Sequence, residues 1–428
     1  MKKIKIGLIG FGTVGAGVVK VLNEKRASLK ASTGLDLEIV RICVKHISSK
    51  RPVEVAKDVL TSSIDEVLYD KQIDIVVELI GGIQPAKEII MEALRQGKHV
   101  VTANKALLAE CGAEIFGLSQ KLRLAVGFEA SVGGGIPIIR SLREGFIANK
   151  IDLIYGILNG TSNFILSEMS EHGTQFKDAL LYAQKLGYAE KDPSFDVGGI
   201  DSAHKLSILA LLGFGVFAAQ DSIYTEGITD IEQSDIDYAS ENGYAIKLLA
   251  IAKRRKEGVE LRVHPTLIPK THLLANVGDV YNAIFVRGDL VGDNLFYGKG
   301  AGSLPTASSV VSDLVSVAAG IAAGVIPCIT PVAGTASAVC DMSDIRSRYY
   351  VRFTVVDKPG VLSKISGILG NHDISIATVT QKEIKSEKPV PIVMMSHEAR
   401  ESDMAAALRI IDELDVIKSK TVCVRVEE

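Results

Sequence analysis

Two charged side chains open an apolar helix-like run in the segment GGIDSAHKLSILALLGFG. Asp201 and Lys205 have the spacing i, i+4, which places both on one face of a helix. Charged groups are rarely buried unless they are paired. A lysine in a desolvated, carboxylate-lined site has a pKa that its surroundings can adjust, so it can transfer a proton. An inert buried ion pair is the alternative interpretation.

More carboxylates precede this pair in the stretch AQKLGYAEKDPSFDVGG, namely Glu190, Asp192 and Asp196. Pro193 and the paired glycines after Val197 keep the stretch out of a long helix. The pattern predicts an acidic loop that leads into the helix of Lys205. His204 points to another face of that helix, so we expect it to be structural.

The segment GLIGFGTVGAGV has the spacing G-x-G-x-x-G after an apolar run at residues 4–9. Such a motif predicts a tight turn, a close approach of backbone amides to a pyrophosphate, and close packing of the helix on the strand. The amides at positions 13 and 14 are the expected phosphate donors. A structural glycine turn is the alternative. The predicted dinucleotide-binding loop is Gly10, Phe11, Gly12, Thr13, Val14 and Gly15.

The loop after the second predicted strand bears on the choice of nucleotide. NAD enzymes usually place an acid there, but this loop reads CVKHISSKR, with Lys45, Lys50 and Arg51. Asp36 and Glu38 stand at the start of the strand instead. We therefore predict NADP(H), with NAD(H) as the alternative coenzyme. A solvated lysine-rich loop is the structural alternative.

Two further positions stand next to predicted strand ends or glycine turns. Lys105, in HVVTANKALLA, follows the carboxyl end of a strand, where open α/β sheets bind ligands. An exposed lysine at a helix start is the alternative. Glu129, in FEASVGGGIP, precedes a glycine-rich loop whose carbonyls could complete a site for a hard cation. For Glu129 the alternative is a helix cap.

Strands and helices alternate in the first part of the chain, which predicts a parallel sheet of the α/β class. An α+β region follows, with long strands and a predicted hairpin at 282–298. A helix of small apolar residues then returns toward the first domain, residues 342–348 form a polar linker, and a βαββαβ unit ends the sequence. The predicted divisions are 1–130, 131–305, 306–341 and 349–428.

Composition narrows the class of protein. The 428 residues carry a formal net charge of −3, no Trp and five scattered cysteines. A nucleic-acid binder would show a basic stripe or stacking aromatics. Zinc-type and disulfide-type cysteine spacings are absent, which is typical of a reducing compartment. The apolar runs 206–219 and 314–327 are shorter than the about 20 residues of a membrane span. We expect a cytoplasmic enzyme with no nucleic-acid or membrane partner.

The sequence resembles the homoserine dehydrogenase family over most of residues 1–340. The stretch AQKLGYAEKDPSFDVGGIDSAHK carries the likeness, together with GILNGTSNFIL, VVTANKALLA, FEASVGGGIP and FYGKGAGSLPTAS. From Tyr349, the stretch VVDKPGVLSKISGIL resembles an ACT domain, a regulatory amino-acid-binding module. The likeness is to the monofunctional form of the family. Lys45-His46 stands where the family pattern leads us to expect Arg-Asp.

The resemblance implies NAD(P)H-dependent interconversion of L-aspartate 4-semialdehyde and L-homoserine, in threonine and methionine biosynthesis. It gives Lys205 the proton transfer and Asp201 the orientation of the lysine or the substrate. Residues 131–305 would form a catalytic and dimerisation domain with a sodium ion. The remaining implied roles are substrate ammonium binding by Glu190, a cofactor–substrate position for Lys105, a cofactor contact by Gly302, and sodium binding by Glu129 with the carbonyls of Val132, Gly134 and Ile136.

The ACT-like tail predicts regulation and assembly. Pro359 and Gly360 would form a turn at which the amides of Val361 and Leu362 hold a ligand carboxylate. The resemblance implies L-threonine as the effector and a homodimer or homotetramer. A role in assembly alone is the alternative. Because the motifs named above all precede Tyr349, removal of the tail is expected to leave an active core.

Two other functions fit parts of the pattern. The chain could be a non-catalytic amino-acid sensor with a relic Rossmann domain, which the set Asp201, Lys205 and Glu190 argues against. Aspartate-semialdehyde dehydrogenase would need a cysteine nucleophile. Cys111 is the nearest candidate, but it stands in a predicted helix without a histidine partner. A zinc alcohol dehydrogenase is disfavoured because no Cys/His cluster occurs.

Overall fold

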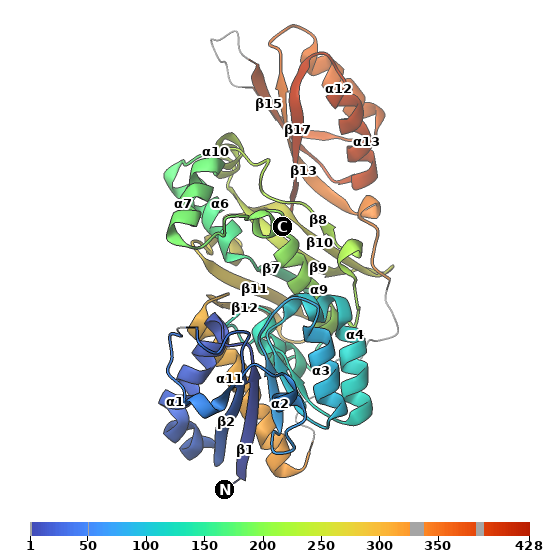
Figure 1. The fold of residues 1–428 in the computed structure, drawn as a ribbon. Helices are drawn as coiled ribbons and strands as arrows, with labels where there is room; N and C mark the ends of the chain where they lie inside the picture. Colours follow the sequence, from blue (N-terminus) through green and yellow to red (C-terminus); the bar gives the residue numbers. More distant parts are fainter. Residues whose placement is uncertain (1, 50, 326–337, 382–388) are drawn as a thin grey trace. The chain divides into compact units, whose positions relative to one another are not determined.

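A computed structural model describes residues 2–49, 51–325, 338–381 and 389–428. The chain divides into two compact units, each assembled from segments far apart in the sequence (Figure 1). The first unit comprises Met1–Leu158, Ala203–Ile223 and Tyr281–Ser337. The second comprises Asn159–Ser202, Tyr224–Val280 and Ala338–Glu428.

A parallel sheet in the order β3-β2-β1-β4-β5-β6 forms the base of the first unit, as the alternation of strands and helices predicts. The strand order reverses beside β1, where open α/β sheets bind ligands. The strands are β1 (Lys2–Ile9), β2 (Leu35–Cys43), β3 (Leu60–Thr61), β4 (Ile75–Glu78), β5 (His99–Thr102) and β6 (Val126–Gly127). The helices between them are α1 (Thr13–Thr33), α2 (Asp65–Leu68), α3 (Ala86–Arg95) and α4 (Lys105–Leu122).

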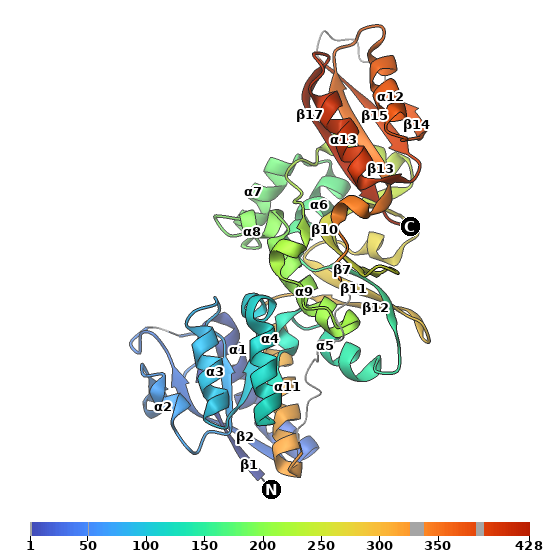
Figure 2. The same ribbon diagram turned by 90° about the vertical axis from the view of Figure 1, so that its right-hand side faces the viewer.

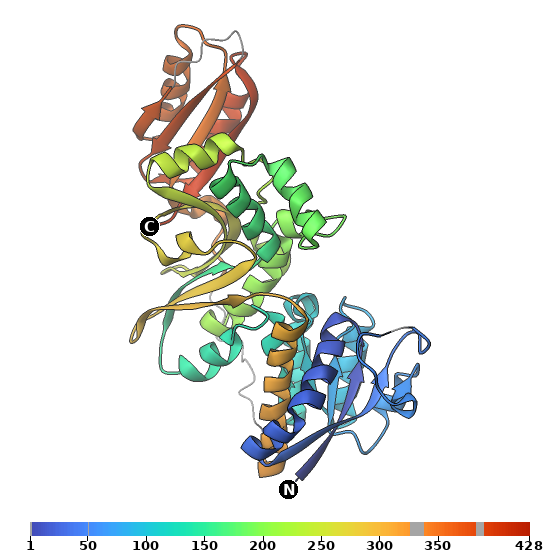
Figure 3. The ribbon, with the colours of Figure 1, turned by 90° about the vertical axis from the view of Figure 1, so that its left-hand side faces the viewer.

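Helix α11 (Ser303–Ala323) lies beside α1 and adds its apolar side chains to the core of this sheet (Figure 3). The contact is close because Gly17 has no side chain: a Cβ there would lie 2.7 Å from the carbonyl oxygen of Ser303. Within the described residues, α11 is the one helix long and apolar enough to cross a membrane, but Val310, Leu314 and Val317 are buried in this core. Residues 326–337 of the predicted return segment lie outside the described residues.

The first unit also contains an antiparallel set of strands in the order β12-β11-β7. Strands β11 (Tyr281–Gly288) and β12 (Gly292–Lys299) form the predicted hairpin, and β7 (Ile151–Ile157) pairs with β11. A short helix, α5 (Ile138–Arg140), continues into the π-helical turn Ser141–Gly145. This is the helix expected after the glycine turn, and it is shorter than the sequence suggests.

The second unit contains the long antiparallel pair β9 (Tyr244–Arg254) and β10 (Val259–Pro269). Strand β9 is absent from the sequence-based prediction. Its seven central residues are all buried, and a continuous apolar run cannot be distinguished from a buried helix by periodicity. The other elements are β8 (Tyr224–Thr225), α6 (Gly160–His172), α7 (Phe176–Leu186), α8 (Ser194–Val197) and α10 (Gln233–Glu241). Helix α9 (Ile200–Phe214) begins at the end of the segment Asn159–Ser202.

The tail folds as the predicted βαββαβ unit, with both helices on one face of its sheet (Figure 2). The antiparallel strand order is β17-β13-β15-β14. Its elements are β13 (Arg346–Val355), α12 (Val361–Asn371), β14 (Ile376–Thr380), β15 (Val390–Ser396), β16 (Ala399–Arg400), α13 (Glu401–Asp412) and β17 (Ile417–Val426).

The predicted linker 342–348 is wrong in its second half. Arg346 and Ser347 pair with Arg400 and Ala399, so strand β13 already begins at Arg346. Nor is the tail a separate sheet. Strand β17 pairs in parallel with β10 of the same unit, with Thr266 opposite Arg425. The ACT-like region and residues 244–269 therefore share a hydrogen-bonded sheet.

Candidate active site

The glycine motif at the N-terminus of α1 has the geometry of a coenzyme-binding loop. Gly10 has φ 104°, and a Cβ there would lie 2.6 Å from the carbonyl oxygen of Leu79. A Cβ at Gly15 would lie 2.2 Å from the carbonyl oxygen of Gly10, so α1 packs directly on the turn. A Cβ at Gly12 would meet nothing within 4 Å, which leaves the start of α1 at Thr13 accessible to a phosphate.

A second glycine loop lies beside the first. Gly302 has φ 119° and precedes α11, and the next residue, Ser303, donates a hydrogen bond of 2.8 Å to the carbonyl oxygen of Thr13. Another glycine, Gly134, fits against this loop, since a Cβ there would lie 2.5 Å from the carbonyl group of Gly300. The structure thus brings Gly302 next to the fingerprint, where a contact with the coenzyme is feasible.

The basic loop after β2 also approaches the fingerprint. Lys45 is exposed just beyond the carboxyl end of β2. Arg51 donates hydrogen bonds to carbonyl oxygens of its own loop, and its guanidinium lies 5.7 Å from the centre of the Phe11 ring. Lys50 lies outside the described residues. The sequence-based site set contains Lys45 but not Arg51, whose place beside Phe11 depends on the folded loop.

The acids of β2 are engaged elsewhere. Asp36 pairs with Arg26 at 2.9 Å, and Glu38 pairs with Lys3 at 2.6 Å. Both acids belong to the first half of β2, far along the strand from its carboxyl end. Neither acid is therefore placed to hold the ribose hydroxyls of NAD. The sequence predicts the same from their positions at the start of the strand.

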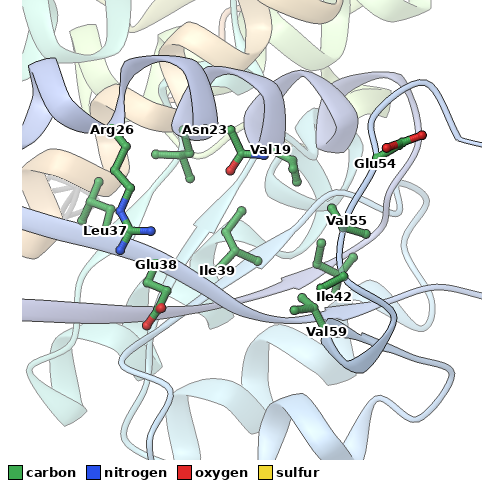
Figure 4. A pocket seen from close by; sticks show the side chains of 12 residues that line it. Val19, Asn23, Arg26, Leu37, Glu38, Ile39, Ile42, Glu54, Val55 and Val59 are labelled. Atoms are coloured by element: carbon green, nitrogen blue, oxygen red, sulfur yellow. The ribbon is translucent and has the colours of Figure 1, made fainter.

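A hollow of about 280 Å³ between α1 and β2 is distinct from this loop (Figure 4). Apolar side chains such as Val19, Ile39 and Val55 line it, with Arg26 and Glu54 at its rim. These residues come from the middle of α1, from β2 and from the segment before β3. A coenzyme phosphate would bind at the N-terminus of α1 instead.

Lys105 is the first residue of α4 and follows the carboxyl end of β5, as expected. The preceding Asn104 fixes this corner: its Oδ1 accepts from the amide of Leu107 at 3.2 Å, and its Nδ2 donates to the carbonyl oxygen of Gly82 at 2.7 Å. Cys111 lies within the same helix, which confirms the helical position predicted for it from the sequence.

Lys205 and Asp201 lie one turn apart on α9, and both are buried, with 7% and 3% of their surfaces exposed. The Nζ of Lys205 donates a hydrogen bond of 2.6 Å to the carbonyl oxygen of Leu158, just after β7. This contact fixes the ammonium group of a side chain that is well shielded from water. His204 hydrogen-bonds Gln220 at 2.7 Å, in keeping with its expected structural role.

Asp201 shares an asparagine with another carboxylate. The Nδ2 of Asn159 donates to Asp201 at 2.9 Å and to Asp196 at 2.7 Å. The Oδ1 of Asn159 caps α6 by accepting from the amide of Ser162 at 2.8 Å. Sequence reasoning missed Asn159, although it belongs to the block GILNGTSNFIL.

Glu190 is exposed on the loop after α7, and its carbonyl oxygen accepts from the side chain of Gln184 at 3.1 Å. Asp192, on the same loop, accepts from the amide of Ser194 at 3.1 Å. The second carboxylate that accepts a hydrogen bond from Asn159, besides Asp201, belongs to Asp196 and not to Glu190. The carboxylate of Glu190 is accessible to a ligand from solvent.

Glu129 caps the short helix α5. A helix cap is the alternative to a cation ligand that the sequence offers for this residue. Its carboxylate oxygens accept from the amides of Ile139 at 2.8 Å and Arg140 at 2.9 Å. Its own amide donates to Asp313 at 2.7 Å. Burial raises the pKa of Glu129, although these amide hydrogen bonds oppose the shift. Burial also raises the pKa of Asp313, to about 7. The negative charge of the nearby Glu129 shifts this pKa in the same direction.

The other proposed sodium ligands are backbone carbonyls of the loop that follows Glu129. The carbonyl oxygen of Gly134 accepts from Ser309 Oγ at 2.6 Å, and that of Ile136 accepts from the amide of Ile138. Each carbonyl oxygen has a second lone pair, so the oxygen donors still fit a hard monovalent cation. Among the described residues there is no group of three or more His, Cys, Asp and Glu side chains that could hold a metal ion.

A hollow of about 320 Å³ surrounds the turn at the N-terminus of α12. Gly360 has φ 87° there, a conformation that disfavours any side chain. This is the turn from which the sequence predicts an effector site. The walls comprise Val355, Val356, Asp357, Lys358, Pro359, Gly360, Val361, Leu362, Gln381 and Ile392.

Family models match three parts of the chain. Residues 10–129 match "Homoserine dehydrogenase, NAD binding domain", residues 137–315 match "Homoserine dehydrogenase", and residues 349–416 match "ACT domain". The homoserine dehydrogenase of Pseudomonas aeruginosa is 44% identical over 434 residues, covering 100% of each chain. That of Neisseria gonorrhoeae is 43% identical, covering 100% of this chain and 99% of its own.

The chain belongs to the homoserine dehydrogenase family. A crystal structure of the homoserine dehydrogenase from Thiobacillus denitrificans matches with a TM-score of 0.91 at 45% identity, covering 100% of this chain and 99% of that one. A hyperthermophilic archaeal homoserine dehydrogenase matches 74% of this chain and 98% of its own, with a TM-score of 0.63 at 27% identity. The protein is a homoserine dehydrogenase in function, an oxidoreductase acting on a CH–OH group, with an NAD-binding domain and a C-terminal ACT domain.

Proposed function

We propose that this homoserine dehydrogenase interconverts L-aspartate 4-semialdehyde and L-homoserine with Lys205 as its acid and base. The single observation that carries the assignment is the buried Lys205 ammonium, fixed at 2.6 Å from the carbonyl oxygen of Leu158. The bound coenzyme supplies or accepts the hydride. Lys205 donates a proton to the aldehyde oxygen in reduction and accepts it from the hydroxyl in oxidation.

The other polar residues bind and orient in this proposal. Asp201, fixed by Asn159, orients the substrate or the lysine, and the accessible carboxylate of Glu190 pairs with the substrate ammonium group. Lys105, at the carboxyl edge of the parallel sheet, contacts both coenzyme and substrate and assists proton movement. The proposed chemistry is a cation at the reacting oxygen and a carboxylate at the ammonium.

The preferred coenzyme in this proposal is NADP(H). Arg51 supplies positive charge beside Phe11, the exposed Lys45 follows β2, and the acids of β2 are paired elsewhere. The solved structure of the hyperthermophilic archaeal relative is described as a complex with NADPH. Backbone amides of Thr13 and Val14, at the start of α1, would bind the pyrophosphate, with Gly302 beside them.

A sodium ion, cytoplasmic localisation and an oligomer complete the proposal. Glu129 with the carbonyls of Val132, Gly134 and Ile136 supplies oxygen ligands, although the same carboxylate already caps α5. The ACT-region hollow at Gly360 would bind an amino-acid effector, L-threonine by family resemblance. The oligomer would be a homodimer or homotetramer. The domain divisions 1–130, 131–305, 306–341 and 349–428 stay predictions. The family matches support the first, second and last of them, while the match over 137–315 crosses the boundary at 305.

Steady-state oxidation of L-homoserine, compared with NADP and with NAD, tests the proposal. We expect turnover with both coenzymes and a higher kcat/KM with NADP. Inhibition by L-threonine, with D-threonine as the control, tests the effector. Failure to oxidise homoserine with either coenzyme would contradict the assignment, and a preference for NAD would overturn the role of the basic loop.

A further inference from the structure

Arg425, on the ACT strand β17, is buried among side chains from two parts of the second unit. Its guanidinium donates to Glu226 at 2.6 Å, to the hydroxyl of Tyr224 at 3.1 Å and to Glu401 at the start of α13. It also lies 5.0 Å from the centre of the Tyr224 ring. Only 5% of Arg425 is exposed, whereas the carboxylate partner Glu226 is open to solvent on one side, with 38% of its side chain exposed.

Glu226 begins a segment that packs on the acidic loop. Its amide donates to the carbonyl oxygen of Val263 in β10 at 2.8 Å. A Cβ at the next residue, Gly227, would lie 2.3 Å from the carbonyl oxygen of Val197, so the two backbones are in direct contact. The amide of Ile228 then donates to that same carbonyl oxygen at 2.9 Å. Residues 227 and 228 therefore pack directly against the backbone of Val197.

Val197 is the last residue of α8, and Asp196 and Asp201 flank it within a few residues. Both carboxylates accept from Asn159. Between them, Gly199 has φ 85°, and a Cβ there would lie 3.2 Å from Thr225 and 3.4 Å from the carbonyl oxygen of Glu226. A shift of residues 225–228 would therefore move the segment that places Asp201.

We propose that Arg425 and Glu226 are positioning residues for segment 196–201, so that the last ACT strand sets the geometry of Asp201, the acid of this segment with a proposed role at the substrate. The inference rests on the proposed role of Asp201 at the substrate. Arg425 of β17 holds Glu226 by an ion pair, and residues 227–228 contact Val197. Asn159 then holds Asp196 and Asp201 by hydrogen bonds. The ACT region contributes to catalysis even when no effector is bound.

The second unit offers a matched control for this ion pair. Arg352 of β13 donates to Asp235 of α10 at 2.7 Å and 3.1 Å, and both residues are buried. This bond also joins the ACT region to residues 224–280. However, Asp235 belongs to α10, which packs on α6 and β9 rather than on β8. A role that is only structural would affect both pairs alike.

The test uses the full chain and four variants: Glu226→Gln, Arg425→Met, Asp235→Asn and Arg352→Met. We expect Glu226→Gln and Arg425→Met to lower kcat/KM for homoserine by about tenfold to a hundredfold, since a misplacement of about 1 Å has effects of this order. The KM for the coenzyme should change less than about twofold, because neither variant displaces the coenzyme loop. Glu226 is 38% exposed, so Glu226→Gln should fold even if Arg425→Met does not.

Thermal unfolding and a double variant complete the design. Asp235→Asn and Arg352→Met should lower Tm at least as much as Glu226→Gln does, yet keep kcat/KM for homoserine near that of the parent. Arg425→Lys should recover part of the loss. Glu226→Gln combined with Arg425→Met should be no worse than Arg425→Met alone, because the two residues act as one unit.

Two results would overturn the inference: unchanged homoserine kinetics in Glu226→Gln, or equal kinetic losses in the control pair. Asp201→Asn, measured in parallel, separates this inference from the proposed function. A fully active Asp201→Asn variant would refute the role of Asp201 itself. With Asp201→Asn impaired, the Glu226→Gln result, judged against Asp235→Asn, decides the positioning role.

Discussion

The parallel sheet of the first unit and the mixed sheet of the second hold their functional groups by different means. In the first, glycines let backbones meet, and the candidate coenzyme loop lies where Gly10, Gly15 and Ser303 come together. In the second, ion pairs between distant segments hold the backbone in place, as in Arg425–Glu226 and the fully buried Arg352–Asp235.

The polar side of β10 shows this difference most clearly. Alternate residues along the strand are all buried and polar: Glu260, Arg262, His264 and Thr266. Arg262 donates to His264 at 2.8 Å, to Glu260 at 3.3 Å, and to Glu427 just beyond β17. Burial and the nearby arginines keep the pKa of His264 well below its usual range, so the neutral ring can accept from Arg262. Such a network depends on every member, whereas a glycine turn depends mainly on its own backbone.

Removal of the residues from Tyr349 onward should have the largest effect. It takes away the partners of the buried Arg262 and Asp235 and of the partly exposed Glu226. Loss of one partner of a buried ion pair costs about 3–5 kcal/mol, which applies to Arg262 and Asp235. The sequence alone suggests an active core, but these contacts lead us to expect an unfolded or insoluble second unit. Circular dichroism and homoserine oxidation by the truncated chain check this, and a soluble, fully active core would contradict it.

Lys205→Ala should lower kcat by about 10²–10⁴-fold, the usual contribution of a general acid or base. Coenzyme binding should persist, because the fingerprint at Gly10–Gly15 opens α1, whereas Lys205 belongs to α9. Single-turnover kinetics, with fluorescence titration of NADPH, measure the two effects separately. A variant that retains nearly full turnover would show that the buried ammonium at Leu158 is only structural.

Gly15→Ala and Gly12→Ala separate packing from ligand approach within the coenzyme loop. A Cβ at Gly15 meets the Gly10 carbonyl oxygen at 2.2 Å, so backbone must move, at a cost of about 1–3 kcal/mol. Gly15→Ala should therefore lower Tm and raise the coenzyme KM. A Cβ at Gly12 meets nothing within 4 Å, so Gly12→Ala should keep its Tm while the coenzyme KM rises. Equal changes of Tm in both variants would argue against this distinction.

Lys45→Asp should raise the KM for NADP by about tenfold, which corresponds to about 1.4 kcal/mol, and should spare NAD. The physical reason is loss of a charge near the expected 2′-phosphate and gain of an acid that repels it. Arg51→Met gives an independent measure, because Arg51 lies over Phe11. Parallel changes with both coenzymes would make Lys45 an ordinary surface charge.

The effect expected of Asp313→Asn is on the pH dependence of stability rather than on catalysis. The native pKa of about 7 exceeds the value of about 3.9 for a free aspartate, so the native state retains a proton that the unfolded state releases between these pH values. The free energy of unfolding then falls as pH rises from 4 to 7, by at most about 1.4 kcal/mol per pH unit. Urea unfolding at several pH values should show a flatter profile for Asp313→Asn, and an unaltered slope would refute the shift.

The features that could be predicted from the sequence are those that depend on local residues, as in the glycine turn of the first unit. The glycine fingerprint is local, so its spacing predicts the turn, the parallel sheet and the start of α1. Asp201 and Lys205 are equally local, at one helical turn. Asn159 belongs to another segment, so its bridge between Asp201 and Asp196 leaves no signal in their spacing.

Contacts over long stretches of sequence were the least predictable. Arg425 and Glu226 are 199 residues apart, and neither belongs to a recognisable motif. Strand β9 was missed because its buried run lacks alternation, and the start of β13 was mistaken for a linker because Arg346–Arg348 looks solvated. Sequence patterns report which residues are polar, but the folded partners determine whether a polar residue is a surface group or a buried one.

The pairing of β10 with β17 also has a consequence for synthesis on the ribosome. Thr266 cannot meet Arg425 until some 160 further residues have been made, so β10 emerges long before its parallel neighbour. Unpaired strand edges are sites of aggregation, and natural proteins protect them with charged side chains. Strand β8 precedes β10 in the chain and pairs with it at Arg262 and Val263, so the edge that waits for β17 is the stretch at Thr266 and Leu267. Arg262 also waits for Glu427, which follows β17. We therefore expect folding intermediates that lack β17 to be most exposed to aggregation at Thr266 and Leu267.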